Sequence, residues 1–238
     1  MSKIAIITAR GGSKRIPKKN IKPFLGKPII AYSIEAALKS ELFEEVMVST
    51  DDNEIASIAK EYGASVPFLR SDSAADDNAT TADALLDVFE AYNKLNRVFD
   101  YACCLYPTAP FVTATKLKDA YNELVAQNFD SVFPVMKFSY PIWRSLKKDG
   151  NMLKMNWPEY LNSRSQDLLE SFHDAGQFYF LKVESFLRDK KLFSDNSGGI
   201  VIDDLEGQDI DSFSDWKLAE LKYQLMQSEN EGIYTGRR

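Results

Sequence analysis

The amino-acid sequence predicts an α/β fold in which helices flank a Rossmann-like, mostly parallel sheet. Short apolar runs alternate with helix-like amphipathic segments as far as residue 135, the pattern that produces parallel sheets covered on both faces. The chain of 238 residues can bury one substantial core, and its 45% hydrophobic and 27% charged residues are usual for a globular protein. We therefore expect a single domain over residues 1–227, followed by a flexible polar tail, 228–238.

Five runs in the first part of the chain predict strands. Each is short and apolar, as strands buried on both faces are: residues 4–7, 46–48, 66–69, 101–105 and 131–135. Cys103 and Cys104 are neighbours in the fourth run, so their side chains should point to opposite faces of the sheet. We expect them to be reduced core residues.

Helices are expected between these strands. The first follows Pro28, the second ends at Gly63, and the third is capped by Thr80 or Thr81. A fourth helix is expected before residue 131. Each of the four helices has an apolar face, in chain order Ile30, Ile34, Ala37 and Leu38; Ile55, Ile58, Ala59 and Tyr62; Leu85, Val88, Phe89 and Tyr92; and Leu117, Ala120, Tyr121, Leu124 and Val125.

Two adjacent carboxylates, Asp51 and Asp52, follow the second strand. They fit either a metal site or the start of a helix, where Asp51 and Glu54 would form a capping box. Helix capping is the simpler explanation. The polar stretch 71–81 is expected to be a loop.

The regular alternation stops between residues 138 and 170. This stretch mixes aromatic residues and prolines with a Lys-Lys-Asp-Gly turn at residues 147–150, and predicts an inserted hairpin arm of the kind that pairs with a second subunit. We therefore expect a homodimer. Strands resume at residues 178–181 and 200–202, and a last helix spans about residues 214–227, with Trp216, Ala219 and Tyr223 on its apolar face.

Composition excludes several classes of protein. The first apolar run has only four residues, and no run approaches the ~20 residues of a membrane span, so we expect a cytoplasmic protein with no membrane partner. The net charge of −6 argues against a nucleic-acid partner. Residues 1–34 nevertheless hold eight Lys or Arg and no acid, so the rest of the chain carries −14. Positive charge concentrated in one segment suits a small polyanion such as a nucleoside triphosphate.

A basic, glycine-containing loop directly follows the first strand. Residues 8–21 (TARGGSKRIPKKNI) place five cations within ten positions around Gly11 and Gly12. Glycine lets the backbone approach a ligand closely, and N–H groups with ammonium and guanidinium groups form a cradle for phosphate. The spacing matches neither a P-loop nor a dinucleotide fingerprint. The alternative is a solvated basic loop.

The segment A-R-G-G-S-K-R-I-P-x-K-N-I, residues 9–21, resembles the signature loop of the CMP-sialic acid synthetase family, cytidylyltransferases that activate nine-carbon sugar acids. Thr8 stands where the family usually has proline, which should loosen the turn. Further matches extend to about Trp216, and the chain looks most similar to the pseudaminic acid branch. The resemblance implies a GT-A-like nucleotidyltransferase fold that binds CTP.

Loops after different strands should converge on one cleft, because ligands of such sheets bind beyond the carboxyl ends of the strands. The basic loop, Arg70 and the Tyr106–Pro110 loop all follow predicted strands. By resemblance, Arg10, Lys14 and Lys19 would hold the phosphates and take part in catalysis. The other nucleotide-binding candidates are Ala9, Gly11, Gly12, Ser13, Asn20, Arg70 and Thr80, of which the last three would contact ribose or cytosine.

Asp209 and Asp211 lie two residues apart, so in an extended segment both carboxylates point the same way. Hard oxygen ligands beside a triphosphate suit Mg²⁺. A charge cluster before the last helix explains the pair equally well. The segment Q-D-I-D resembles the metal motif of the family, which favours Mg²⁺ as cofactor, with Asp211 as the first choice of direct ligand and as a catalytic residue.

The sugar acid is expected to meet a second group of side chains. Arg164 can hold a carboxylate by a bidentate fork, or merely pair with Asp167. His173, the single histidine, fits a structural hydrogen-bonding group or a substrate contact. By resemblance, further contacts would come from Gln166, Gln177, Tyr179 and Tyr106, the last standing where sialic acid relatives have glutamine.

The resemblance implies the reaction of CTP with pseudaminic acid to give CMP-pseudaminic acid and pyrophosphate. A synthetase for N-acetylneuraminic or legionaminic acid would share everything except sugar preference. A nucleotide-sugar glycosyltransferase and a non-enzymatic polyanion binder are the alternatives from other classes.

Overall fold

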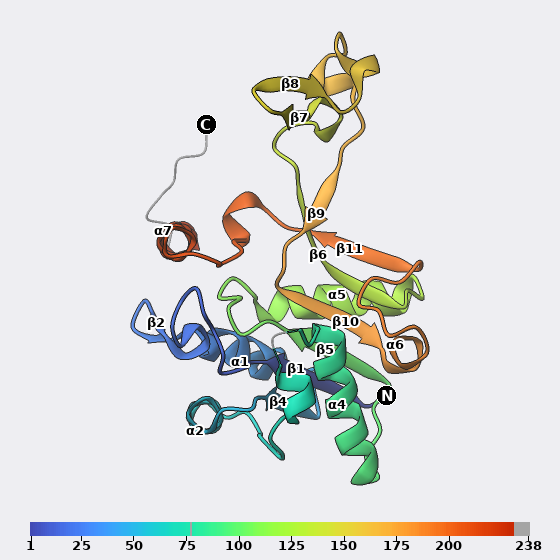
Figure 1. The fold of residues 1–238 in the computed structure, drawn as a ribbon. Helices are drawn as coiled ribbons and strands as arrows, with labels where there is room; N and C mark the ends of the chain where they lie inside the picture. Colours follow the sequence, from blue (N-terminus) through green and yellow to red (C-terminus); the bar gives the residue numbers. More distant parts are fainter. Residues whose placement is uncertain (77, 231–238) are drawn as a thin grey trace.

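The computed structural model describes residues 1–76 and 78–230, and its centre is a mixed sheet (Figure 1). Within the described residues this sheet has seven strands in the order β11-β6-β10-β5-β1-β4, with β9 paired to β6. Its strands are β1 (Lys3–Thr8), β4 (Glu45–Ser49), β5 (Tyr101–Leu105), β6 (Ser131–Lys137), β9 (Phe172–Asp174), β10 (Phe178–Lys182) and β11 (Ser197–Val201).

The strand directions confirm the predicted fold class. β1 runs parallel to both β4 and β5, and β11 runs parallel to β6. β10 is antiparallel to β5 and β6, and inserts between them. The parallel trio β4-β1-β5 therefore ends at one edge of the sheet, where the basic loop begins.

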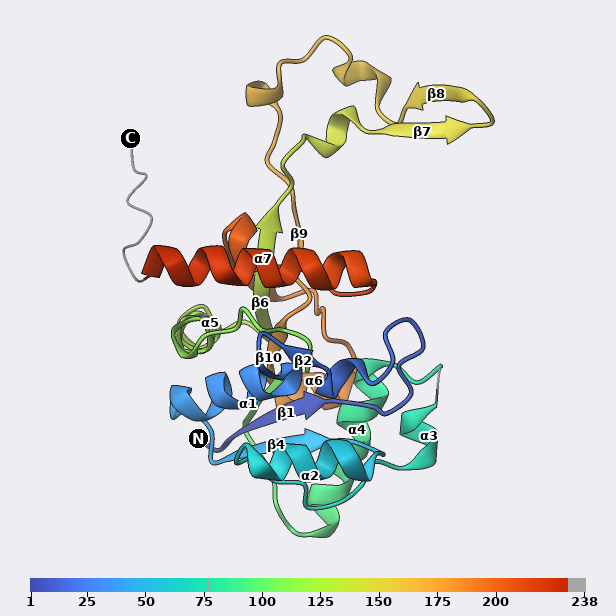
Figure 2. The ribbon, with the colours of Figure 1, turned by 90° about the vertical axis from the view of Figure 1, so that its left-hand side faces the viewer.

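Helices cover both faces of the sheet (Figure 2). Ile34 of α1, Ala59 of α2 and Leu124 of α5 pack with Cys103 on one face. Val88 of α4 and Phe186 of α6 pack with Cys104 on the other face, so the predicted opposite orientation of the two buried thiols is confirmed. The helices are α1 (Ile29–Ser40), α2 (Asn53–Glu61), α3 (Asp72–Ala75), α4 (Thr81–Lys94), α5 (Ala114–Ala126), α6 (Val183–Asp189) and α7 (Phe213–Asn230), and the 3₁₀ turns are η1 (Lys19–Ile21), η2 (Ile142–Arg144), η3 (Pro158–Tyr160), η4 (Ser165–Asp167) and η5 (Asp204–Glu206).

A third apolar cluster lies outside both sheet faces and connects the two ends of the chain. Ile16 of the basic loop and Phe24 of the small β2–β3 ribbon pack with Ile210 and with Trp216 of α7. β2 (Pro23–Phe24) and β3 (Lys27–Pro28) pair across a turn in which Gly26 has a φ of 97°. The last helix is thereby held against the basic loop.

The strand predicted at residues 66–69 is wrong. Only Ser65 bridges to the sheet, opposite Met47, and its N–H donates to the Val46 carbonyl. Pro67 lacks an N–H and cannot continue the ladder, so the chain leaves the sheet. The predicted loop at residues 71–81 also contains the short helix α3. Leu38 and Val125, expected on buried faces, are about two-fifths exposed, at 41% and 42%.

The capping box predicted for the second helix is wrong as well. Asp52, not Asp51, caps α2, since its Oδ1 accepts the N–H groups of Glu54 at 2.7 Å and Ile55 at 3.0 Å. Glu54 pairs instead with Lys18. The cap predicted for the third helix is confirmed: Thr80 and Asp83 form a capping box at the start of α4.

Residues 138–171 form an arm that projects from the sheet between β6 and β9 (Figures 1 and 2). It contains a hairpin of β7 (Leu146–Asp149) and β8 (Met152–Met155), turned at Gly150 with a φ of 59°. Several large apolar side chains of this arm are exposed: Tyr140, Leu146, Met152, Leu153, Leu161 and Leu169.

The last helix, α7, runs three residues further than predicted, to Asn230. The Ser228 hydroxyl donates to the Gln224 carbonyl one turn earlier. The rest of the predicted tail, residues 231–238, lies outside the described residues. Over the described part of the chain, no helix combines the length and the apolar character needed to span a membrane.

Candidate active site

A cavity of about 550 Å³ opens beyond the carboxyl ends of β1 and β5. The basic loop forms one wall, and the start of α4 with the loop after β5 forms another. The predicted convergence of loops is thus present in the structure. The lining residues are Thr8, Arg10, Gly12, Ser13, Lys14, Arg15, Lys19, Asn20, Arg70, Ala79, Thr80, Thr81, Ala84, Tyr106, Pro107 and Thr108.

Hydrogen bonds fix the conformation of the basic loop. The Gly11 N–H donates to the Asp51 carboxylate at 2.9 Å, and the Asn20 amide donates to the Arg10 carbonyl at 2.8 Å. The Ser13 hydroxyl donates to the Ile16 carbonyl at 2.6 Å. Asn20 is therefore a loop anchor in addition to lining the cavity.

Gly11 is required by a close approach of two chain segments. A Cβ atom at this position would lie 2.8 Å from Asp52 Oδ2 and 3.0 Å from the Asp52 Cβ. At Gly12, by contrast, an added Cβ would meet nothing within 4 Å. Ala9, just before the pair, is fully buried and serves the core.

Most cations of the basic loop line the cavity, and Lys18 does not. Arg10, Lys14 and Lys19 all line the cavity, and Arg10 also donates to the Asp76 carbonyl at 3.2 Å. Lys18 lies 2.5 Å from Glu54 of α2, which raises the pKa of its ammonium through that hydrogen bond and charge. The loop therefore directs most of its charge to one place, where a polyanion would be held.

The segment that carries the two predicted carboxylates meets the basic loop through Asp211. Asp211 Oδ1 lies 2.8 Å from the Arg15 guanidinium and 3.7 Å from the Lys19 ammonium. Lys19 also donates to the Ile210 carbonyl at 2.8 Å across 191 residues of sequence. Packing explains the meeting, because Ile16 and Ile210, one in each segment, are buried in the same apolar cluster.

The carboxylate pair fits a divalent cation. Asp209 is exposed, yet partial desolvation of its carboxyl and the charge of Asp211 raise its pKa. A bound cation would relieve that repulsion. Among the described residues, no group of three or more His, Cys, Asp or Glu is arranged to hold a metal, so any metal here keeps waters or substrate oxygens as ligands, as Mg²⁺ does.

Arg70 and Thr80 line the cavity with their polar groups already engaged. Arg70 is 7% exposed and donates to the Ser49 hydroxyl at 2.9 Å and to the Ser49 carbonyl at 2.6 Å. Burial lowers the pKa of its guanidinium, against the opposing charge of Asp51. The Thr80 hydroxyl exchanges hydrogen bonds with Asp83.

On the predicted sugar side, only Tyr106 lines the cavity. Its hydroxyl lies 3.3 Å from that of Thr81, and Tyr179 packs behind it with ring centroids 5.6 Å apart. Gln177 is 2% exposed and donates to the Glu206 carbonyl at 2.6 Å. It therefore anchors the segment that leads to Asp209.

The other sugar-side candidates lie on the arm or at its base. Arg164 and Gln166 are exposed beside η4, with Gln166 lining a separate cavity of the arm. No ion pair joins Arg164 to Asp167 among the described residues, so the alternative pairing is not seen in the structure. His173 on β9 lies opposite Met136, and its ring packs against Phe138 at 4.9 Å.

The structure adds two anchors that sequence reasoning missed. Asp51 holds the Gly11 N–H, and its one sequence signal is that it directly follows a strand neighbouring β1. Lys116 of α5 lies 2.9 Å from Glu206 and so ties η5 to the body of the protein. No local pattern identifies Lys116, because its partner is 90 residues away.

Comparisons with known proteins identify the family of this chain. Residues 4–169 match the family model described as cytidylyltransferase. A pseudaminic acid cytidylyltransferase of Campylobacter jejuni subsp. jejuni serotype O:23/36 (strain 81-176) is 41% identical over 226 residues, which cover 94% of this chain and 97% of that protein. The CMP-N,N'-diacetyllegionaminic acid synthase of Legionella pneumophila subsp. pneumophila (strain Philadelphia 1) is 34% identical, with 94% and 97% covered.

Among solved structures, a CMP:2-keto-3-deoxy-manno-octonic acid synthetase complexed with CTP has the same fold. Its TM-score is 0.68 at 15% identity, and the match covers 96% of this chain and 100% of that one. From the extent of the family-model match and of the matches to these relatives, the chain belongs to the cytidylyltransferase family.

Proposed function

We propose that this protein activates pseudaminic acid, converting it with CTP into CMP-pseudaminic acid and pyrophosphate in the cytoplasm. The chain is a nucleotidyltransferase, and its 41% identity to a pseudaminic acid cytidylyltransferase supports the choice of sugar. The observation that carries the chemistry is the meeting of Asp211 with Arg15 and Lys19, because it brings metal-type ligands and phosphate-type ligands to one place.

In the proposed reaction the anomeric hydroxyl oxygen of the sugar acid attacks the α-phosphorus of CTP. A new P–O bond forms, the bond to the bridging oxygen breaks, pyrophosphate leaves with the electron pair, and the hydroxyl proton passes to solvent. Arg10, Lys14 and Lys19 orient the triphosphate and offset the charge on the leaving group. When bound to Asp209 and Asp211, Mg²⁺ would supply further charge neutralisation and acidify the attacking hydroxyl.

A homodimer would give Arg164 and Gln166 a role in this reaction. Both residues lie within the arm, residues 138–171, and neither is among the residues that line the cavity of their own chain. The exposed apolar side chains of the arm are suited to burial against a second copy. We propose that the arm of one subunit brings these residues to the cavity of the other, where Arg164 holds the sugar carboxylate.

Other functions are less well supported. For legionaminic acid, the named relative is more distant, at 34% identity. A glycosyltransferase would need a carboxylate pair after a mid-sheet strand. The adjacent carboxylates Asp51 and Asp52 instead follow the edge strand β4, and they are engaged by the Gly11 N–H and by the cap of α2. A passive polyanion binder gives no reason for Asp211 to face the cations.

The test is pyrophosphate release from a panel of sugar acids, each with Mg²⁺ and either CTP or UTP. We expect the fastest release with CTP and pseudaminic acid. Asp211→Asn should lower turnover by at least 100-fold, whereas Asp119→Asn, a matched charge change on the exposed face of α5, should not. Release with no sugar acid, or full activity of Asp211→Asn, would reject the proposal.

A further inference from the structure

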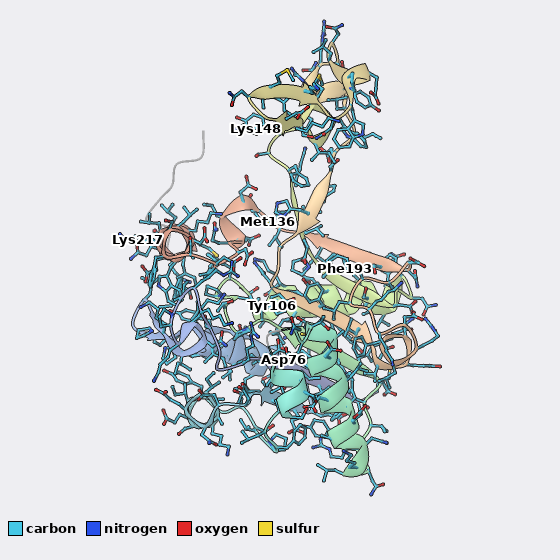
Figure 3. The ribbon with its side chains drawn as sticks, viewed as in Figure 1. Asp76, Tyr106, Met136, Lys148, Phe193 and Lys217 are labelled. Atoms are coloured by element: carbon cyan, nitrogen blue, oxygen red, sulfur yellow. The ribbon has the colours of Figure 1, made fainter. Side chains whose placement is uncertain are left out.

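Arg15 joins two parts of the candidate active site that differ in charge. Its guanidinium lies 2.8 Å from Asp211 Oδ1, and its side chain also lines the cavity beside the basic loop. Figure 3 labels Tyr106 on the wall of that cavity and Lys217 on α7, the helix that follows Asp211. Arg15 can therefore serve either an anion in the cavity or the carboxylate that precedes α7.

Lys19 reaches the same carboxylate but is held more firmly. Its ammonium lies 3.7 Å from Asp211 Oδ1 and donates to the Ile210 carbonyl at 2.8 Å, and its side chain is 21% exposed. The Arg15 side chain, by contrast, is 69% exposed. Ile16, the next residue, is fully buried and fixes the backbone at this point. The Arg15 side chain can therefore change rotamer while the loop stays in place.

A metal ion and the Arg15 guanidinium compete for the Asp211 carboxylate. Mg²⁺ binds its oxygen ligands at about 2.0–2.1 Å, whereas Asp211 Oδ1 already lies 2.8 Å from the guanidinium. Two cations on one carboxylate repel each other at close range. The guanidinium must therefore give way when a metal binds Asp211. A triphosphate in the cavity offers it oxygen atoms that match the fork geometry of arginine.

We infer that Arg15 is an exchangeable counter-ion, which leaves Asp211 for the triphosphate when Mg²⁺ and CTP bind together. The ion pair thus disfavours binding of the metal without nucleotide, and binding of CTP releases the carboxylate for the metal. By linkage, each ligand then strengthens the binding of the other. The inference rests on the proposed function, because CTP and Mg²⁺ are the ligands proposed for this site.

The first measurement is the binding of Mn²⁺, a paramagnetic substitute for Mg²⁺, to the protein without nucleotide, followed by electron paramagnetic resonance. Arg15→Gln removes the charge and keeps a polar side chain. We expect it to tighten Mn²⁺ binding about two- to fivefold, which is what an exposed ion pair supplies. Lys18→Gln removes the same charge from a residue that pairs with Glu54, and should leave the Mn²⁺ affinity unchanged.

The second measurement is the binding of CTP without metal, by calorimetry. Arg15→Gln should weaken this binding about two- to fivefold, because one phosphate ligand is lost. Asp211→Asn should tighten it, since Arg15 is then released to the triphosphate. The gain should be smaller in the Arg15→Gln background, where no guanidinium is left to release. This double-mutant cycle separates the exchange of Arg15 from the loss of a negative charge near the phosphates.

Three results would overturn the inference. These are an unchanged Mn²⁺ affinity in Arg15→Gln, equal gains in CTP affinity from Asp211→Asn in both backgrounds, and tighter Mn²⁺ binding with unchanged CTP binding, which would make Arg15 a fixed partner of Asp211. Failure of the proposed function is distinct, since wild type would then release no pyrophosphate. If Asp211→Asn leaves Mn²⁺ binding unchanged, the proposed metal site and the inference are both rejected.

Discussion

At the scale of single residues, the two glycines of the basic loop are adjacent in sequence but differ in the space around them. Gly11→Ala would place a methyl group 2.8 Å from Asp52 Oδ2, so the loop or the start of α2 must shift. We expect a loss of about 1–3 kcal/mol in the free energy of unfolding. Gly12→Ala has open space and is the matched control. Chemical denaturation of both variants checks the prediction, and equal stabilities would contradict it.

Glu45 on β4 should make stability depend on acidic pH. Its carboxylate accepts from Ser65 and lies 2.5 Å from Arg97. Burial alone would raise its pKa, but the hydrogen bond from Ser65 and the interactions with Arg97 outweigh burial and lower the pKa from the ordinary value of a glutamate. The folded state therefore prefers the ionised form, and this stabilisation is complete above the unfolded pKa and disappears as pH falls through the folded pKa.

Replacing Glu45 tests the predicted direction in which stability changes with pH. Glu45→Gln should lower stability by about 1–2 kcal/mol at pH 7, and its melting temperature should fall less steeply than that of wild type below pH 4.5. Thermal unfolding followed by circular dichroism between pH 3 and 7 makes the comparison, with the exposed neighbour Glu44→Gln as control. Parallel pH curves for wild type and Glu45→Gln would contradict the assignment.

At the scale of elements, the segment that carries the carboxylates depends on anchors to the body of the protein. The turn η5 is tied by the ion pair of Lys116 with Glu206 and by the Gln177 side chain. Lys222 of α7 donates to the carbonyls of Asp204 and Gly207. We expect these contacts to set where Asp209 and Asp211 stand relative to the loop.

Lys116→Met should therefore weaken the proposed metal site without touching it. We expect the Mg²⁺ concentration for half-maximal turnover to rise about three- to tenfold, which is the effect of about 1 kcal/mol, while CTP binding measured without metal is unchanged. Lys118→Met, two residues further along α5 and exposed, serves as control. Equal loss of CTP affinity would show that Lys116 supports the whole cavity instead.

The elements that local pattern could predict are those whose partners are also local. The apolar runs of β1, β4 and β5 were predicted correctly because burial on both faces leaves a continuous signature. The run at residues 66–69 looked alike but contains Pro67, and a bridge forms only at Ser65. Asp51 accepts the Gly11 N–H, which is 40 residues away in sequence, and Asp52 caps α2 instead. No local pattern reveals a partner at that distance.

The same limit applies to the candidate site. The basic loop is recognisable within fourteen residues, since both glycines and the cations lie together. The meeting of Asp211 with Arg15 could be proposed only through resemblance, because it depends on the burial of Ile16 beside Ile210. The positions of Arg164 and Gln166 on an extended arm follow from the path of the chain and not from their own chemistry.

At the scale of the whole molecule, the arm can be removed at a natural junction. Lys137 of β6 pairs with Phe172 of β9, and the Phe138 N–H donates to the Ser171 carbonyl at 2.9 Å. A two-residue Asn-Gly turn can therefore replace residues 139–170. We expect this variant to fold and bind CTP as a monomer but to lose turnover. Analytical ultracentrifugation and calorimetry measure these properties, and a dimer without the arm would contradict the proposal.

A mixing experiment is the control for that deletion. If each cavity is completed by the partner's arm, a mixed dimer of Arg164→Ala and Asp211→Asn subunits carries both defects in one cavity and leaves the other cavity with neither. Subunits carrying one or the other substitution should be nearly inactive alone and should regain activity when exchanged with each other. If no activity returns after confirmed subunit exchange, Arg164 and Asp211 of the same subunit serve the same cavity, and the proposal that the arm serves the partner's cavity is contradicted.

The cluster of Ile16, Phe24, Ile210 and Trp216 is separate from both faces of the sheet. It has its own aromatic contacts, such as Phe24 with Trp216 at 5.7 Å. A region with its own apolar centre can open and close by itself. When this region opens, the basic loop and the carboxylates would move apart while the sheet keeps its amide protons protected. The proposed active site can thus open reversibly at a free-energy cost below that of global unfolding.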